Sequence, residues 1–140
     1  DLANINAFLR VKILKKPWDY LERVLLDGGL VEKKIFMQNL QGSLETFVQE
    51  LSRTPYSKLC EDGIEKIQSS KGIAYFENMT DDYIMNYVKK ARYVTLGIEP
   101  LIAYLKAKQT EIKNARIIMV GKINNISGEI IRERLREAYV

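Results

Sequence analysis

The sequence predicts an all-α fold, an antiparallel helical bundle. Apolar residues recur at spacings of three and four along most of the chain, beginning with Leu2, Ile5 and Leu9, which is the period of an amphipathic helix. Only 3 prolines and 8 glycines interrupt the 140 residues, so no long linker is expected. The hydrophobic content of 46% and the charged content of 29% are typical of a folded domain.

Capping residues and helix breakers divide this pattern into separate helices. Ser43 and Ser127 each precede an apolar segment and are expected N-caps. Thr54, followed by Pro55, is expected to begin another helix, because proline is favoured at the first helical position. Thr80 is a further expected N-cap. The expected helices lie at about residues 2–13, 19–27, 31–40, 44–51, 55–68, 81–96, 99–123 and 128–140.

The longest expected helix begins at Glu99-Pro100 and runs to about Ile123, which corresponds to roughly 35 Å at 1.5 Å per residue. Gly121 lies inside it, where glycine costs up to about 1 kcal/mol relative to alanine, and close packing of another helix would explain it. One face of the helix is apolar and is expected to be buried. The residues of that face are Leu101, Tyr104, Leu105, Ile112, Ala115, Ile118 and Met119.

A weak internal repeat relates the two ends of the chain. Residues 1–21 align with residues 111–131 at an offset of about 110, so that Asn4 falls on Asn114 and Lys12 on Lys122. With few identities, chance similarity is the alternative. If the repeat is real, residues 1–26 are the end of a preceding helical repeat unit and residues 27–140 form the last unit.

Residue content excludes several kinds of catalytic site. The chain has no histidine and a single cysteine, Cys60, so an intramolecular disulfide, a Cys/His zinc site and histidine-based catalysis are excluded. A packing role for Cys60 is favoured over a reactive thiol.

No apolar segment approaches the ~20 residues of a membrane span. The net charge of +4 is spread among acids, which argues against nucleic-acid binding.

The remaining polar motifs also favour structural interpretations. Asp81-Asp82 has no companion ligands for a metal and is expected in the first turn of a helix, where negative charge suits the helix dipole. Gly28-Gly29 lacks the residues of a phosphate-binding loop and is expected to be a turn. No catalytic residue, metal site or cofactor is therefore expected. Three tyrosines at helical spacing are expected in the core: Tyr83, Tyr87 and Tyr104. A solvated face is favoured over an acidic-partner site for Lys89, Lys90 and Arg92.

Several motifs along the chain follow the pattern of one protein family. Residues 1–12 read Asp-x-x-Asn-Ile-x-x-x-x-Arg-x-Lys, residues 27–29 contain a Gly-Gly turn, and residues 54–56 are Thr-Pro-Tyr. The most specific positions are Gly97, Glu99, Pro100, Ala107, Lys108, Asn114, Arg116, Gly121 and Lys122. In these motifs the whole chain resembles the C-terminal part of the C subunit of archaeal and bacterial V-type (A-type) ATP synthases, the counterpart of the d subunit of the eukaryotic vacuolar pump. Gln109 and Ser127-Gly128 depart from the family pattern.

This resemblance implies a fold and a role. The family fold is a funnel of three pseudo-threefold-related helical units. By this resemblance the protein is expected to be a non-catalytic rotor subunit, peripheral on the cytoplasmic side of the membrane. It would couple the proteolipid ring to a central shaft of the D and F subunits during proton or sodium transport. A helical scaffold for other proteins is the alternative. By the funnel geometry, Lys89, Lys90 and Arg92 are the candidate partner-binding residues.

Overall fold

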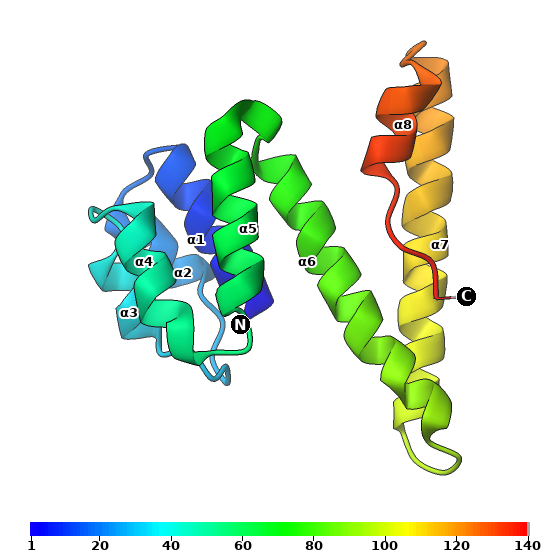
Figure 1. Ribbon diagram of the computed structural model, residues 1–140, viewed down its shortest axis with the longest axis horizontal. Coiled ribbons are helices and arrows are strands. Elements are labelled where there is room, and N and C mark those ends of the chain that lie inside the picture. The colour runs from blue at the N-terminus through cyan, green and yellow to red at the C-terminus, as the bar shows by residue number, and fades with distance from the viewer. Residues whose placement is uncertain (140) are drawn as a thin grey trace. The chain divides into compact units, whose positions relative to one another are not determined.

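The computed structural model describes residues 1–139, apart from the side chains of residues 70 and 71. Every regular element in that part of the chain is helical (Figure 1), which confirms the predicted all-α class. The α-helices are α1 (Leu2–Ile13), α2 (Trp18–Val24), α3 (Lys33–Gln38), α4 (Leu44–Glu50), α5 (Ser57–Lys66), α6 (Ile73–Val88), α7 (Glu99–Ile123) and α8 (Gly128–Arg134). Short 3-10 segments η1 (Leu51–Arg53) and η3 (Lys89–Tyr93) and a π-turn, η2 (Ile67–Lys71), connect them.

The chain divides into two compact units, Asp1–Glu77 and Asn78–Val140. We call them unit 1 and unit 2. This division differs from the predicted repeat boundary after residue 26, because helices α1 and α2 pack with the residues that follow them. The assignment of residues 1–26 to a preceding repeat unit stays a prediction, since compactness and repeat ancestry are different properties.

Three phenylalanine rings form the centre of unit 1. The ring centroids of Phe8 and Phe47 are 4.3 Å apart, and Phe36 lies 5.9 Å from Phe8 and 5.7 Å from Phe47. All three side chains are fully buried, so α1 is held against α3 and α4 by aromatic packing. Lys12 fixes the end of α3 from outside, because its ammonium donates to the backbone carbonyls of residues 39, 40 and 42 at 2.7–2.8 Å.

Unit 2 is built on α7, whose bounds agree with the predicted 99–123. Gly121 is buried, and a Cβ at this position would lie 2.7 Å from two side-chain carbons of Ile131 in α8. The close helix packing predicted at Gly121 is therefore confirmed.

The predicted burial of the apolar face of α7 is wrong. Leu105 is 54% exposed and Met119 63%, and Tyr87 and Tyr104, expected in the core, are exposed too. Tyr83 is half-buried. The periodicity predicted the helix correctly but could not show whether another element covers its face.

Two of the predicted N-caps are confirmed. The hydroxyls of Ser43 and Ser127 accept from the backbone N–H groups three residues later, at 3.1 and 3.5 Å. Thr54 instead lies three residues before α5. Its hydroxyl donates to the Leu51 carbonyl and accepts from the Tyr56 N–H. The prediction at Thr80 is wrong, because α6 begins at Ile73 and Thr80 is buried within it.

The two ends of the chain share a helix–turn–helix geometry at an offset of 110 residues. Helices α1 and α7 end at residues 13 and 123, and α2 and α8 span residues 18–24 and 128–134. Asn4 donates to the Leu26 carbonyl at 2.9 Å and accepts from its N–H at 2.8 Å. Asn114 makes the same two bonds to Arg136, at 2.9 and 2.8 Å. In each pair the residues lie 22 positions apart, so one polar bridge ties each second helix to its first.

Candidate interaction surface

The three predicted partner-binding residues lie in the 3-10 segment η3. Residues three apart share a face of a 3-10 helix, and Lys89 and Arg92 accordingly both contact the C-terminal residues 135–139, here called the C-terminal segment. The Lys89 ammonium donates to a Glu137 carboxylate oxygen at 2.6 Å. Arg92 donates to the Tyr139 carbonyl at 2.7 Å, and its guanidinium lies 5.3 Å from the centre of that ring.

Glu137 is the main attachment point of this segment. Besides Lys89, its carboxylate accepts from the Asn86 amide at 3.0 Å, and its backbone N–H donates to Asp82 at 2.8 Å. The hydrogen bond from Lys89 is the largest cause that lowers the pKa of the Glu137 carboxyl. Two of the three predicted residues thus hold the chain's own C-terminal segment against α6 and η3.

Lys90 differs from its neighbours because its ammonium lies 5.6 Å from the centre of the exposed Tyr87 ring. It lines a recess of about 280 Å³ between η3 and the start of α7, together with apolar side chains such as Val94 and Ile102. The loop beside the recess exposes further apolar groups, with Tyr93 87% and Leu96 89% exposed. This end of unit 2 therefore offers an apolar surface with a lysine at its edge.

The Asp81-Asp82 pair is not in a first helical turn, which corrects the prediction. It lies in the middle of α6, where Asp81 accepts from both Lys113 and Arg136 at 2.8 Å. Burial raises the pKa of Asp81, but the bonds to these two cations outweigh it and the net pKa is lowered. Burial raises the pKa of Asp82. The pair binds the C-terminal segment and α7 to α6.

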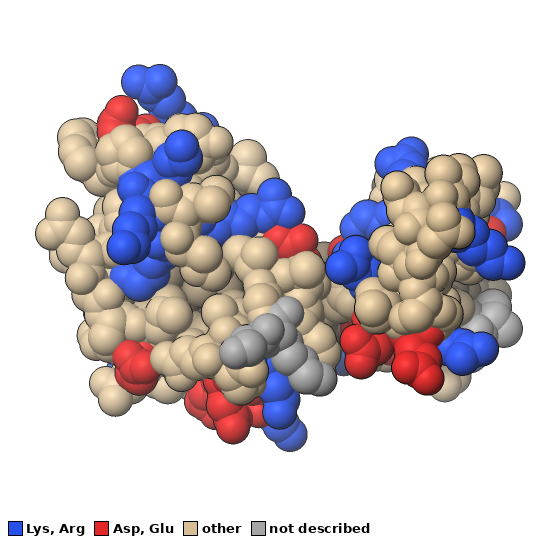
Figure 2. Space-filling model, turned by 90° about the horizontal axis from the view of Figure 1, so that it is seen from above, with Lys and Arg blue, Asp and Glu red and all other residues tan. Residues whose placement is uncertain are grey.

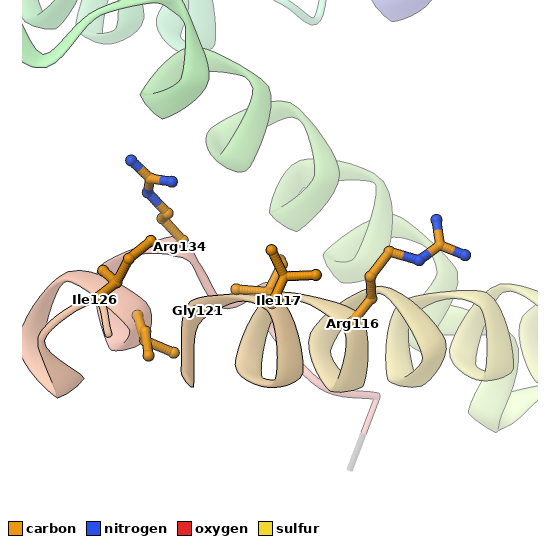
Figure 3. A pocket seen from close by; sticks show the side chains of 7 residues that line it. Arg116, Ile117, Gly121, Ile126 and Arg134 are labelled. Atoms are coloured by element: carbon orange, nitrogen blue, oxygen red, sulfur yellow. The ribbon is translucent and has the colours of Figure 1, made fainter. Parts of the chain in front are cut away.

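A second groove lies between α7 and α8 (Figure 3). Its volume is about 260 Å³ and its wall is mainly apolar. Arg116 and Arg134 stand at its two ends, with Ile117 and Gly121 between them. Neither guanidinium has a hydrogen bond or ion pair to another described residue.

The other candidates for chemistry have structural surroundings. Cys60 is fully buried in unit 1. Burial first, and then the charge of Glu61, raise the pKa of its thiol to about 12, which disfavours the reactive thiolate. The described residues contain no group of three Cys, Asp or Glu side chains placed to hold a metal ion. No helix within residues 1–139 combines the length and the apolar character that a membrane crossing requires.

Comparison with known proteins identifies the family of this chain. Residues 1–134 match the family model described as the ATP synthase (C/AC39) subunit. The chain belongs to this family. The resemblance found in the sequence to the C subunit of V-type and A-type ATP synthases is thereby confirmed.

Relatives within the C/AC39 family cover nearly the whole chain. The C subunit of the V-type sodium ATPase of Enterococcus hirae is 31% identical over 139 residues, which are 99% of this chain and 42% of that protein. The C subunit of the A-type ATP synthase of Methanocaldococcus jannaschii is 30% identical over 138 residues, 96% of this chain and 35% of that protein. The chain thus spans less than half the length of these relatives. No solved structure matches it.

The interactions of the C-terminal segment were not found from the sequence. Asp82 and Asn86 lie 51–55 positions from their partner Glu137, and no periodicity relates them. The internal repeat aligns Asn114 with Asn4, which indicates that the two residues are equivalent but not which bonds they make.

Proposed function

We propose that this chain is part of a non-catalytic central-stalk subunit of a V-type or A-type ATPase or ATP synthase. The observation that carries the proposal is the family match over residues 1–134, together with relatives named as the C subunits of a sodium ATPase and of ATP synthases. In this role the protein couples the proteolipid ring of the membrane sector to the central shaft of the D and F subunits while protons or sodium ions are transported. It lies peripherally on the cytoplasmic side.

The packing of the chain suits a part that transmits torque. A rotor coupler must deform little under load, and close-packed helices have low compressibility. In unit 1 the three phenylalanine rings and the lysine clamp of Lys12 fix α1, α3 and α4 to one another. In unit 2, Asp81 of α6 forms ion pairs with Lys113 of α7 and with Arg136 of the C-terminal segment, and Glu137 of that segment pairs with Lys89 of η3. Both sets of contacts oppose sliding of neighbouring helices.

Binding to the two partners tests this proposal. The purified chain is passed over immobilised, detergent-solubilised proteolipid ring and, separately, over immobilised D–F shaft. Retention by at least one of them supports the proposal. A chain that is folded by circular dichroism and is retained by neither would leave the family match without the proposed role.

Lys90 lies beside the Tyr87 ring but has no hydrogen bond or ion pair to another described residue, so its ammonium can bind a new partner. Lys89 and Arg92 are already bound to the C-terminal segment, so their substitution would disturb the fold as well. Lys90→Glu should weaken binding to the ring or the shaft by about fivefold, or ~1 kcal/mol, and should change the salt dependence. Lys34→Glu, a charge reversal at an exposed site of α3, is the matched control and should bind normally. Equal affinities of the two variants would reject Lys90 as a contact.

A helical scaffold that binds other proteins is the second candidate. The uncovered apolar face of α7 favours it, because exposed apolar surface of this kind marks protein interaction sites. The two functions differ only in the identity of the partner, and the binding measurement above separates them.

A further inference from the structure

The turns that follow α1 and α7 have the same backbone but different residues. Lys15 and Asn125 occupy equivalent places and both have left-handed backbones, with φ of 50° and 54°. Each helix ends with the same two backbone hydrogen bonds. These are Lys15 N–H to Lys12 at 3.2 Å, Lys16 N–H to Val11 at 3.0 Å, Asn125 N–H to Lys122 at 3.1 Å and Ile126 N–H to Gly121 at 2.9 Å.

The second turn shows what the fold alone requires. Asparagine tolerates the left-handed region and is a common residue at this place after a helix. Residues 124–128 are Asn, Asn, Ile, Ser and Gly, which suit a turn. The first turn carries Leu, Lys, Lys, Pro and Trp instead, and a lysine with positive φ is conformationally unfavourable. The composition of residues 14–18 is therefore not explained by the turn that they make.

The side chains of the first turn point out of unit 1. Leu14 is 64% exposed and Trp18 59%, and the neighbouring Ile13 and Tyr20 are exposed as well. Lys15 and Lys16 are exposed and have no acidic partner among the described residues. Basic side chains gather on the face of unit 1 at which this turn lies (Figure 2). The turn is thus a protruding tip that combines aromatic, aliphatic and unpaired basic groups.

From this combination we propose that the α1–α2 turn, residues 13–20, contacts an anionic lipid surface. Tryptophan and tyrosine favour the interface between headgroups and acyl chains, where the ring is in apolar surroundings and the polar edge stays hydrated. Leu14 can enter the same layer, and Lys15 and Lys16 attract acidic headgroups. The contact is a surface one and requires no membrane-spanning helix.

Charge and shape favour a lipid surface over an acidic protein partner. The acids nearest in sequence are Asp19, which is half-buried and has Arg23 at 3.9 Å, and the exposed Glu22. The neighbouring recess, of about 320 Å³, is lined by Trp18 together with Met37, Leu40 and two glutamines. None of these lining residues is charged, so Lys15 and Lys16 supply the charge of this surface. A turn whose exposed apolar residues and lysines are adjacent fits a fluid surface, which needs no complementary groove.

The chain contains its own reporter, because Trp18 is its only tryptophan. The purified chain is titrated with vesicles of phosphatidylcholine and phosphatidylglycerol in equal parts, and with vesicles of phosphatidylcholine alone. We expect the tryptophan emission to shift to shorter wavelength and the chain to sediment with the anionic vesicles only. Added salt should reverse both effects, because lipid charge is screened beyond a Debye length.

The turn after α7 provides a replacement sequence that should preserve the backbone of the turn after α1. Replacement of residues 14–17 by the residues of 124–127, with Trp18 retained, should abolish the shift. The single change Lys15→Asn should weaken vesicle binding about fivefold, the change that about 1 kcal/mol per basic residue implies. Lys58→Gln is the control. Lys58 is exposed and lies near Tyr56, whose hydroxyl bonds Asp1 at the opposite end of α1, so this variant should bind as the unmodified chain does.

Three results would overturn the proposal. The first is no emission shift and no sedimentation with anionic vesicles. The second is equal binding to both kinds of vesicle, since the lysines would then have no role. The third is a shift with soluble polyglutamate but not with vesicles, which would identify an acidic protein as the partner. The experiment does not involve the ring or the shaft, so its outcome is independent of the proposed rotor function.

Discussion

At the scale of single residues, Asn4 provides a sharp test because a matched control lies two positions away. Asn4 is buried and bridges both polar groups of Leu26. Asn4→Ala would leave that N–H and carbonyl without their partner, at a cost of about 1–3 kcal/mol. The side-chain oxygen of Asn6 is buried and has no hydrogen-bond partner among the residues that the structure describes, so Asn6→Ala should cost clearly less. Urea unfolding measures both, and equal losses would contradict the role given to the bridge.

Asp81 and Asp82 should respond in opposite directions to loss of charge. The pKa of Asp81 is lowered below 3.8, so its stabilising effect is present above that pH and is lost as the pH falls through the lowered value. Asp81→Asn should cost about 1 kcal/mol at pH 7, since its ion pairs are partly exposed. This difference should vanish in acid.

Asp82 serves as the comparison in the same helix. Its pKa is raised, mainly by burial, so its ionised form destabilises the folded state at pH 7. Asp82→Asn keeps an oxygen for the Glu137 N–H and should leave stability unchanged or raise it. Unfolding of both variants between about pH 2 and pH 7 measures the effect, because this range extends below the ordinary pKa of an aspartate. A large loss in Asp82→Asn at pH 7 would show that its charge is needed.

Residue roles were predictable where they depend on near neighbours. The hydroxyls of Ser43 and Ser127 cap the helices that follow them by accepting from backbone N–H groups three residues ahead, and the sequence contains that information. Lys12 is different, because it bonds carbonyls 27–30 positions away. No local pattern marks a lysine that stabilises a distant helix end, so its role required the structure.

At the scale of elements, α7 allows two substitutions that reverse the usual expectation. Leu105→Ala removes a large apolar side chain, but Leu105 is 54% exposed, so the loss should stay within about 0.5 kcal/mol. Gly121→Ala adds one methyl group against Ile131. Overpacking costs about 1–3 kcal/mol, of which better helix propensity offsets up to about 1. Urea unfolding should therefore rank Gly121→Ala as the more damaging. A loss of 2–5 kcal/mol in Leu105→Ala, the size found for buried leucines, would show that this face is covered in solution.

Helix positions were predicted better than helix surroundings. Glu99-Pro100 and Asn124-Asn125 mark both ends of α7 correctly, because capping chemistry is local. The beginning of α6 was misplaced at Thr80, since a threonine followed by two aspartates has the composition of a helix start even when it lies inside a helix. Aspartates whose partners are Lys113, Arg136 and a backbone N–H of the C-terminal segment cannot be told from capping residues by sequence alone.

At the scale of the whole chain, the two units should differ in local stability. The main buried apolar cluster consists of residues from unit 1, among them Phe8, Phe36 and Phe47. The described residues of α7 bury only Ala103, Ala107, Thr110 and Gly121. Because exchange protection follows buried apolar packing, amides of α7 should exchange with deuterium faster than those of α1. Peptide-level mass spectrometry measures this, and equal protection would mean that a further surface covers α7.

A rotor coupler must hold the ring and the shaft at the same time, and a bridging measurement detects this property. Labelled D–F shaft is added to beads that carry the solubilised proteolipid ring, with and without the purified chain. We expect the beads to retain more shaft when the chain is present, and retention to grow with chain concentration until the sites are filled. If a folded chain leaves retention of the shaft unchanged, this part of the protein does not couple the two.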